Sequence, residues 1–343
     1  MLDIIIDNQV IRIGDRFAFG LHRTLRIPDD GRTYPLPPGL GRFPLFRVSD
    51  YRDRVPAQWR EETAAFIPMF QREALWMGFH AADWKPNAVK IAVGGINVIS
   101  GEPLNSGLNA DPQDYIVCPD QPWLDGINSG QGSIRQFVAM PLGMGYTVEA
   151  ELTGSEKFGG IQISVFEPKP GRFPDTRPVR SESGPVRFAA PKISTAPQSM
   201  GLGAGGEMRQ KIYPDSYGID VWDPDNYGRI VIHIINSAQF LELTGVQPPA
   251  TLVDTKTYTE YGLPWFDLYD ETKADISPSE HFTAVKTIAE IDARKGETAV
   301  DNESVDVAET QIRKLGTDNS GQRSRPASSP VESGSSSEGE RSK

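Results

Sequence analysis

The chain has 343 residues, of which 38% are hydrophobic and 24% charged, a balance typical of a globular protein with one large or two modest cores. Its net charge of −11 argues against binding to nucleic acid or to an anionic membrane surface. The single cysteine, Cys118, excludes an intramolecular disulfide framework, a redox pair of cysteines and a zinc site built on several cysteines.

The N-terminal residues do not resemble a secretory signal. Residues 1–7 carry two acids where such a signal needs cations, and no later run approaches the roughly 18 apolar residues of a membrane-spanning helix. We therefore expect a soluble, cytoplasmic protein. Short strands are predicted at residues 2–6, 9–13 and 16–21.

Residues 56–79 show the three-to-four spacing of an amphipathic helix, with Trp59, Phe66 and Phe70 on one face. Pro68 lies within this pattern and cannot donate a backbone hydrogen bond. We therefore expect a kinked helix, or two helices of which the second begins at Pro68.

A β-hairpin is predicted at residues 88–99, where two apolar runs flank Gly94-Gly95. Two glycines supply the positive φ angles that a tight hairpin turn requires. Residues 229–236 are apolar on both faces, which is typical of a central strand covered on both sides. His233, in the middle of that strand, is interpreted as a hydrogen-bonded core histidine.

A β-meander is predicted from residues 134–140, 146–152 and 161–166. The middle segment alternates strictly between apolar and polar residues, so its apolar side chains point inward. Glu149 and Glu151 then share the outward face of one strand, about 6.6–7 Å apart at their Cα atoms.

Two segments differ in composition from the rest. Residues 168–198 are rich in proline and in basic residues, which is typical of a linker or a long excursion from one domain. Residues 297–343 lose their aromatic side chains and end in a serine-rich run, which predicts a mostly disordered tail. Within that tail, Ser329 precedes a proline and could be phosphorylated.

The sequence predicts one further helix, which begins at Ser277-Pro278-Ser279-Glu280 with a cap, a proline and a capping-box glutamate, and ends at Gly296. Strand runs with the helices set apart predict a mainly β or α+β fold. We expect an antiparallel, β-sandwich-like core with one or two packed helices.

The predicted domains follow from these segments. Residues 1–167 form a β-rich domain with the helix near 57–79, and residues 168–198 form a linker or a long loop. Residues 199–296 contribute a strand and the C-terminal helix, which can belong to the same core. Residues 297–343 form the tail.

Several common motifs are absent from the sequence: the phosphate loop, HExxH and GxSxG. The glycine-rich run at residues 200–206 follows a proline-rich segment instead of a strand, so close backbone packing or a hinge explains it better than a nucleotide. The loop that begins at Asp223 fails as a calcium loop, because Tyr227 and Ile234 stand where liganding oxygens are required.

No cofactor and no metal site are predicted. His80 and Asp83 could share a metal, but no second histidine lies near them in the sequence. Cys118 lies between a valine and a proline and is interpreted as a small buried apolar residue.

The candidate ligand site is the loop at residues 120–132, which mixes an indole ring with carboxylates and amides. These groups can stack on a sugar ring and hydrogen-bond its hydroxyls. The alternative is a glycine-rich turn held by a buried Trp123. Arg135 could also serve a structural ion pair. The candidate residues are Asp120, Trp123, Asp125, Asn128, Gln131 and Arg135.

Three functions therefore stay open. The first is a binding or scaffold protein for a saccharide or another small polar ligand. The second is a carboxylate-dependent hydrolase acting on carbohydrate, with acids drawn from Glu149, Glu151, Asp120 and Asp125, two of which must converge across a cleft. The third is an assembly protein whose basic residues 169–192 dock onto an acidic neighbour, in an oligomer of unknown size.

An aromatic and acidic segment at residues 258–271 could bind a cationic or sugar ligand, or pack across the edge of the core. It contains Glu260 and Gly262-Leu263-Pro264-Trp265-Phe266. With residues 71–76 and 131–149, that pentapeptide resembles a family of uncharacterised microbial proteins. The resemblance covers roughly residues 15–270 without the biased segments. No activity is assigned to that family, so the resemblance implies a shared fold and transfers no functional residue.

Overall fold

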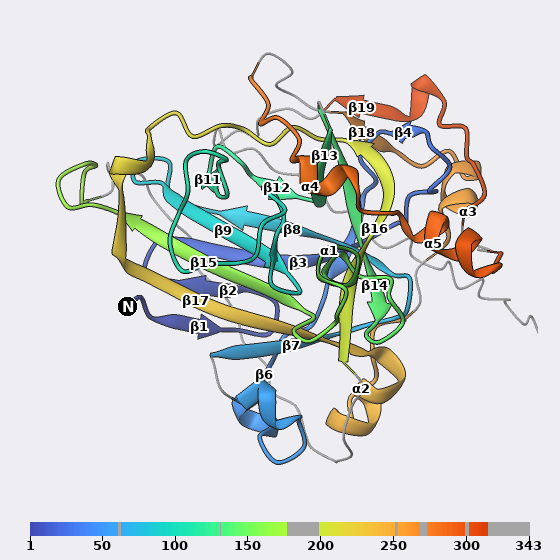
Figure 1. Ribbon diagram of the computed structural model, residues 1–343, viewed down its shortest axis with the longest axis horizontal. Helices are drawn as coiled ribbons and strands as arrows, with labels where there is room; N and C mark the ends of the chain where they lie inside the picture. The colour runs from blue at the N-terminus through green and yellow to red at the C-terminus, as the bar shows by residue number, and fades with distance from the viewer. Residues whose placement is uncertain are drawn as a thin grey trace, which may run out of the picture.

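The structure is a computed structural model that describes residues 1–60, 63–130, 132–176, 199–250, 253–267, 273–298 and 302–314. It is mainly β, with one large and mostly antiparallel sheet, which confirms the predicted fold class (Figure 1). Among the described residues, no helix is long and apolar enough to cross a bilayer.

One group of strands begins at the N-terminus. β1, β2, β3 and β8 pair in that order, each antiparallel to the next. β8 also pairs with β12 and β14, and β14 pairs with β13 and β16. The bounds are β1 Ile4–Ile6, β2 Ile11–Ile13, β3 Phe17–Thr24, β8 Ala74–His80, β12 Trp123–Leu124, β13 Gly126–Gly130, β14 Ser133–Pro141 and β16 Ser199–Arg209.

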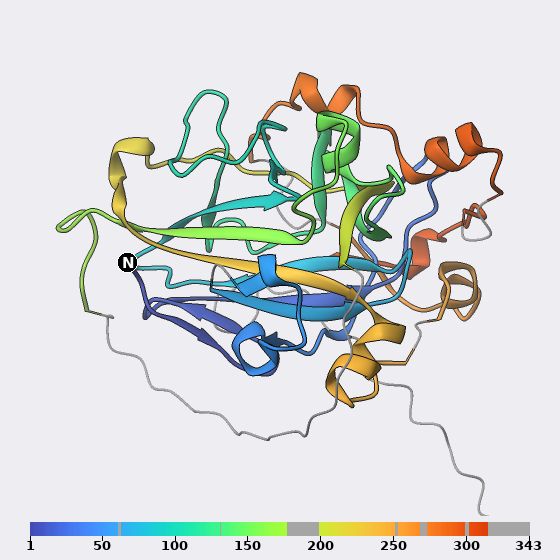
Figure 2. The ribbon, with the colours of Figure 1, turned by 60° about the horizontal axis from the view of Figure 1, so that its bottom comes forward.

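A second group of strands centres on β17. β17 pairs antiparallel with β15 and parallel with β7, and β15 pairs with β9. Figure 2 shows the dark blue strands β1 to β3 beneath the green and gold strands β15 and β17. The bounds are β7 Ala64–Met69, β9 Asn87–Val93, β15 Ile161–Pro168 and β17 Trp222–Asn236.

Shorter elements complete the described fold. The remaining strands are β4 Thr33–Tyr34, β5 Gly39–Arg42, β6 Phe46–Arg47, β10 Ile96–Asn97, β11 Ile116–Cys118, β18 Trp265–Asp267 and β19 Ile312–Lys314. The helices are α1 Val148–Thr153, α2 Ser237–Thr244, α3 Thr255–Glu260, α4 Glu280–Thr283 and α5 Ile288–Lys295, with 3-10 turns η1 Val48–Tyr51, η2 Ala57–Arg60, η3 Ile219–Val221 and η4 Glu309–Gln311.

The main hydrophobic core lies between the two groups of strands. Successive side chains of a strand point to opposite faces, so alternate residues of β3, β9, β15 and β17 meet in one buried cluster. These residues are Phe17, Phe19, Leu21, Val89, Ile91, Val93, Ile161, Ile163, Val165, Ile230, Ile232 and Ile234. Because β16 and β17 pair with β14 and β15, strands from both sides of the proline-rich segment share this core.

The outer face of β17 is also covered. Val231 and Ile235 pack with residues of η1, η2, β7 and α2 in a second cluster. His233 lies between them on the same face and stacks on Trp59, with ring centroids 4.2 Å apart. Burial lowers the pKa of His233 to about 3, as expected for a histidine that stays neutral in a core. The predictions of a doubly covered strand and of the burial of His233 are confirmed, and the side chain of His233 contacts the Trp59 ring.

The three early strands and the glycine turn are also confirmed. Gly94 and Gly95 have φ angles of 57° and 75° between β9 and β10. The glycine-rich run forms most of β16, where close backbone packing, and not a hinge, accounts for it. A Cβ atom on Gly206 would lie 2.3 Å from the Pro28 carbonyl oxygen, and one on Gly203 would lie 2.5 Å from that of Tyr146.

The helix predicted at residues 56–79 is wrong. Trp59 lies in the short turn η2, and residues 64–69 and 74–79 belong to strands β7 and β8. The side chains of β7 are buried throughout, because the core lies on one side and η1, η2 and α2 lie on the other. A strand covered on both sides loses the two-residue alternation, so its apolar residues also match helical spacing.

The predicted meander is wrong as well. Residues 148–153 form helix α1, whose N-cap Thr147 accepts a hydrogen bond from the Ala150 amide at 3.1 Å, and Gly154 ends the helix at φ 71°. β14 and β15 pair with other strands and not with each other. Thr147 and Gly154 are ordinary helix boundaries, and they outweigh the short alternating pattern between them.

The predicted C-terminal helix is divided in two. Ser279 caps the short α4, and Thr287 with Glu290 forms the capping box of α5, which ends at Gly296 as predicted. The capping motif at Ser279 therefore begins a separate and shorter helix. The basic residues 177–192 and the tail beyond residue 314, including Ser329, lie outside the described residues.

Strand β13 offers a sharp test of the packing between neighbouring backbones. A Cβ atom on Gly126 would lie 1.9 Å from the Arg135 carbonyl oxygen of β14, so we expect Gly126→Ala to lower the free energy of unfolding by about 2 kcal/mol or more. A Cβ atom on Gly107 would have no neighbour within 4 Å, so Gly107→Ala should change it by less than about 1 kcal/mol. Urea denaturation measures both, and equal effects would contradict the pairing of β13 with β14.

Candidate ligand-binding cavity

The predicted ligand residues that the structure describes lie on strands β12 to β14 or next to them. Asp125 is fully buried and exchanges two hydrogen bonds of 2.9 Å with the Gln210 side chain. Trp123 is buried, and the buried Asn128 amide donates to the Ser277 carbonyl at 3.1 Å. These side chains are therefore engaged within the fold.

The remaining members of that set have different surroundings. Arg135 donates to the Val285 carbonyl at 2.6 Å, and Asp120 is half-exposed with Lys273 at 3.9 Å. Gln131 lies outside the described residues. The ligand role of the whole set stays a prediction.

Glu149 and Glu151 lie on helix α1 and do not share the face of a strand, which corrects the predicted geometry. Glu149 is buried and accepts hydrogen bonds from the backbone amides of Lys157, Phe158 and Gly159 at 2.7–3.0 Å. Glu151 pairs with Arg294 at 3.1 Å. The carboxylates of Glu149, Glu151, Asp120 and Asp125 therefore contact four different sets of partners.

Cys118 is buried and its thiol donates to the Gln121 carbonyl at 3.3 Å. Burial raises the pKa of this thiol, so it is suited to packing and not to nucleophilic attack. In the described part of the chain, no three His, Cys, Asp or Glu side chains gather as a metal site would require.

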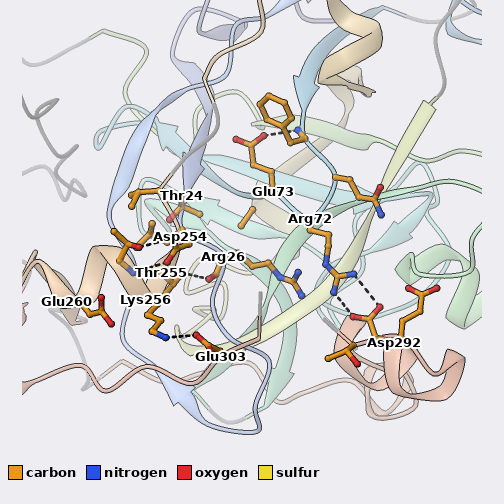
Figure 3. Close-up of a pocket in the computed structure, with 18 residues that line it drawn as sticks. Thr24, Arg26, Arg72, Glu73, Asp254, Thr255, Lys256, Glu260, Asp292 and Glu303 are labelled. Carbon is orange, nitrogen blue, oxygen red and sulfur yellow. Dashed lines mark hydrogen bonds and ion pairs between the residues drawn. The ribbon is translucent and has the colours of Figure 1, made fainter. Parts of the chain in front are cut away.

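A cavity of about 790 Å³ lies elsewhere, at the end of β3 and beside the turn that joins β7 to β8 (Figure 3). The rest of its described wall comes from helices α3 and α5, from the residues next to them and from Glu303. Its polar and charged lining residues come from five segments that are distant from one another in the sequence. These residues are Thr24, Arg26, Gln71, Arg72, Glu73, Asp254, Thr255, Lys256, Thr257, Glu260, Asp292, Glu297, Thr298 and Glu303.

Arg72 enters the cavity from a tight turn in which the Glu73 amide donates to the Phe70 carbonyl at 3.1 Å. Its φ is 68°, and it is the one non-glycine residue with a positive φ among those described. This left-handed conformation costs an ordinary side chain about 1–2 kcal/mol. Non-glycine residues in such conformations cluster at functional sites, which makes this turn a candidate.

An ion pair holds the Arg72 guanidinium. Asp292 of α5 accepts from both terminal nitrogens of Arg72, one of them at 3.3 Å, and from the Tyr146 hydroxyl at 2.8 Å. Burial by itself would raise the pKa of Asp292, but the hydrogen bonds from Arg72 and Tyr146 outweigh burial and lower it.

Arg26, which follows β3, lies close to Arg72. Burial lowers the pKa of the Arg26 guanidinium to about 9, with a further contribution from the positive charge of Arg72, while Asp29 and Asp292 act in the opposite direction. Figure 3 shows both guanidinium groups in the middle of the cavity. Two guanidinium groups therefore lie close together in this cavity, beside the Asp292 carboxylate.

The other end of the cavity is acidic and rich in hydroxyl groups. Asp254 caps α3 and accepts from the amide and hydroxyl of Thr257 at 2.8 and 2.9 Å. Lys256 pairs with Glu303 at 2.8 Å, and Glu260 also lines the cavity. Three carboxylates therefore accompany one ammonium group at this end, whereas Glu297 lies near Asp292, where it accepts from the Tyr146 hydroxyl at 3.2 Å.

The buried Arg23–Glu73 pair stabilises the turn. Arg23 Nε donates to Glu73 Oε1 at 2.6 Å, and the Phe70 amide donates to Oε2 at 2.9 Å. Burial raises the pKa of Glu73, although Arg23 opposes this effect. The two contacts on one carboxylate define the path of the turn and so the position of Arg72.

The central residues of this cavity were not among the candidates predicted from the sequence. Arg26, Arg72 and Asp292 lie 46 and 220 residues apart along the chain, with no spacing motif to join them. Two signals were available: the charged Gln71-Arg72-Glu73 between two apolar runs, and Glu260 in the aromatic and acidic segment. The comparisons with protein-family models, with curated proteins and with solved structures find no match.

The conformation of Arg72 can be tested with two variants that both remove the guanidinium. Arg72→Ala keeps a Cβ atom at a φ of 68°, whereas Arg72→Gly does not. We expect Arg72→Gly to be more stable than Arg72→Ala by about 1 kcal/mol, measured by urea denaturation. Equal stabilities would mean that the turn does not hold residue 72 in the left-handed region.

The lowered pKa of Asp292 predicts that the stability of the fold depends on pH. A lowered pKa in the folded state stabilises the fold above the unfolded value of about 4, and this contribution is lost as the pH falls through the folded pKa. Asp292→Asn should therefore be less stable than the parent chain at pH 7, with a gap that narrows below about pH 4. Denaturation at several pH values measures the gap, and a constant gap would contradict the ionic role of Asp292.

Proposed function

We propose that this protein binds a small polyhydroxylated molecule carrying a carboxylate, such as an acidic saccharide, in the cavity between β3, α3 and α5. The observation that carries the proposal is the division of charge in this cavity. Arg26 and Arg72 lie together in its middle, and carboxylates and hydroxyls line its other end.

The two arginines favour a carboxylate. A guanidinium presents parallel N–H donors that match the two oxygens of a carboxylate. Two guanidinium groups placed close together repel each other, and an anion between them would relieve that repulsion. Asp292 already orients Arg72, so less side-chain freedom would be lost when a ligand binds.

The rest of the cavity favours hydroxyl groups. Carboxylates accept hydrogen bonds from hydroxyls, and threonine hydroxyls both donate and accept. Glu260 and Thr298 line the cavity and offer such groups. A volume of about 790 Å³ lies within the usual range of small-molecule sites. This proposal keeps the predicted class of ligand and moves its site away from residues 120–132.

Calorimetric titration of the full-length protein with glucuronate, glucose and acetate tests the proposal. We expect glucuronate to bind most tightly, because it alone offers both a carboxylate and several hydroxyls. Arg26→Gln should weaken glucuronate binding by about tenfold or more, since a hydrogen bond to a charged group contributes about 1.5–3 kcal/mol.

Arg32→Gln is the matched control, because Arg32 lies in the same loop, pairs with Asp306 at 3.0 Å and does not line the cavity. It should bind glucuronate as the parent chain does. Equal binding of glucose and glucuronate, or an equal loss in both variants, would overturn the assignment of the arginines. Absence of binding by all three ligands would overturn the proposed ligand class.

A further inference from the structure

A second cavity, of about 370 Å³, lies on another side of the molecule beside β1, β6 and the start of β7. Figure 1 shows these three strands together at the lower edge of the molecule. Three arginines from different elements line it: Arg47 of β6, Arg52 just after η1, and Arg60 of η2. No carboxylate is among its described lining residues, which also include Ser49 and Thr63.

The described structure gives these arginines contacts with carbonyl groups and not with carboxylates. Arg47 donates to the Ile6 carbonyl through Nε at 3.1 Å and through Nη2 at 2.6 Å. Arg60 donates to the Val55 carbonyl at 2.8 Å, while its Nε is buried with no hydrogen-bond partner. Arg52 is exposed, and no ion pair of the described residues includes any of the three.

This concentration of positive charge is unusual in a chain of net charge −11. In and beside the first cavity, carboxylates pair with arginines, as Asp292 does with Arg72 and Glu73 does with Arg23. Here three arginines line one cavity, and none of them has an ion pair in the described structure. A buried donor such as Arg60 Nε is also costly to leave without a hydrogen bond.

We propose that this second cavity binds a phosphate group. Arginine forks pair with phosphate oxygens in a bidentate manner, and three of them can contact a tetrahedral ion from different sides. The Ser49 hydroxyl lines the same space and can add a donor, although it now donates to Asp50 at 3.3 Å. Arg47 of β6 also donates a hydrogen bond to the Ile6 carbonyl of β1, which holds these two strands together at one wall of the cavity.

Titration of the full-length protein with inorganic phosphate, against chloride at equal ionic strength, tests this site. We expect saturable binding and a higher thermal unfolding midpoint in phosphate, because a ligand that binds the folded state stabilises it. Arg60→Gln and Arg52→Gln should each weaken phosphate binding by about tenfold. Arg52 is exposed, so that variant should fold even if Arg60→Gln does not. Glycerol phosphate, titrated in parallel, distinguishes a phosphate ester from the free ion as the tighter ligand.

Arg54→Gln is the matched control, because Arg54 lies in the same segment, donates to the Leu243 carbonyl at 3.0 Å and does not line the cavity. It should bind phosphate as the parent chain does, and so should Arg26→Gln, which alters only the first cavity. Equal responses to phosphate and chloride, or an equal loss in Arg54→Gln, would overturn the proposal. Phosphate binding that appears only in Glu61→Gln/Glu62→Gln would also overturn it, because these carboxylates, which follow Arg60 in the sequence, would then neutralise the native site.

Discussion

The double burial of β17 constrains most of the described structure. Its inner side chains, Ile230, Ile232 and Ile234, fill the core between the two groups of strands, while Val231 and Ile235 require a cover of their own. The backbone of β17 also bonds on both edges, to β15 on one and to β7 on the other. A strand with two apolar faces and two paired edges exposes little to water, so η1, η2 and α2 must pack over it.

This arrangement also explains where the first cavity lies. β7 belongs with β17, whereas β8 belongs with β3 and β14, so the chain has to cross between the two groups within four residues. That crossing is the tight turn that places Arg72 in the left-handed region. The buried Arg23–Glu73 pair and the Arg72–Asp292 pair compensate for the strain and for the buried charges. Because β7 and β8 pair with different strands, the turn between them determines where the charged groups of the candidate site lie.

The two cavities differ in the way their arginines are compensated. In the first, carboxylates share the wall with the guanidinium groups, which suits a ligand with both hydroxyls and an acidic group. In the second, the described wall holds arginines and no carboxylate, which suits a compact anion. Their walls are built from different elements, so each can be altered without changing the other. The chain carries an overall excess of acidic residues, and the described wall of the second cavity differs from the chain in this respect.

The sequence by itself determined the mainly β class, the early strands, the turn at Gly94-Gly95, the doubly covered strand around His233 and the end of the last helix at Gly296. Those features depend on local patterns, such as apolar alternation, paired glycines and helix caps, which act over a few residues. The predictions for segments 56–79 and 146–152 were wrong because burial on both faces, or a short helix with good caps, produces patterns that mimic another element.

Tertiary structure alone decided which residues meet. The ligand set predicted at residues 120–132 looked like an exposed polar loop. In the structure β13 pairs with β14, and the side chains of Asp125 and Asn128 are buried and form hydrogen bonds within the fold. Arg26, Arg72 and Asp292 line one cavity although 220 residues separate the last two. No local pattern encodes such a meeting, because the strand order and the crossing between the two groups of strands bring these side chains together only after the whole core has formed.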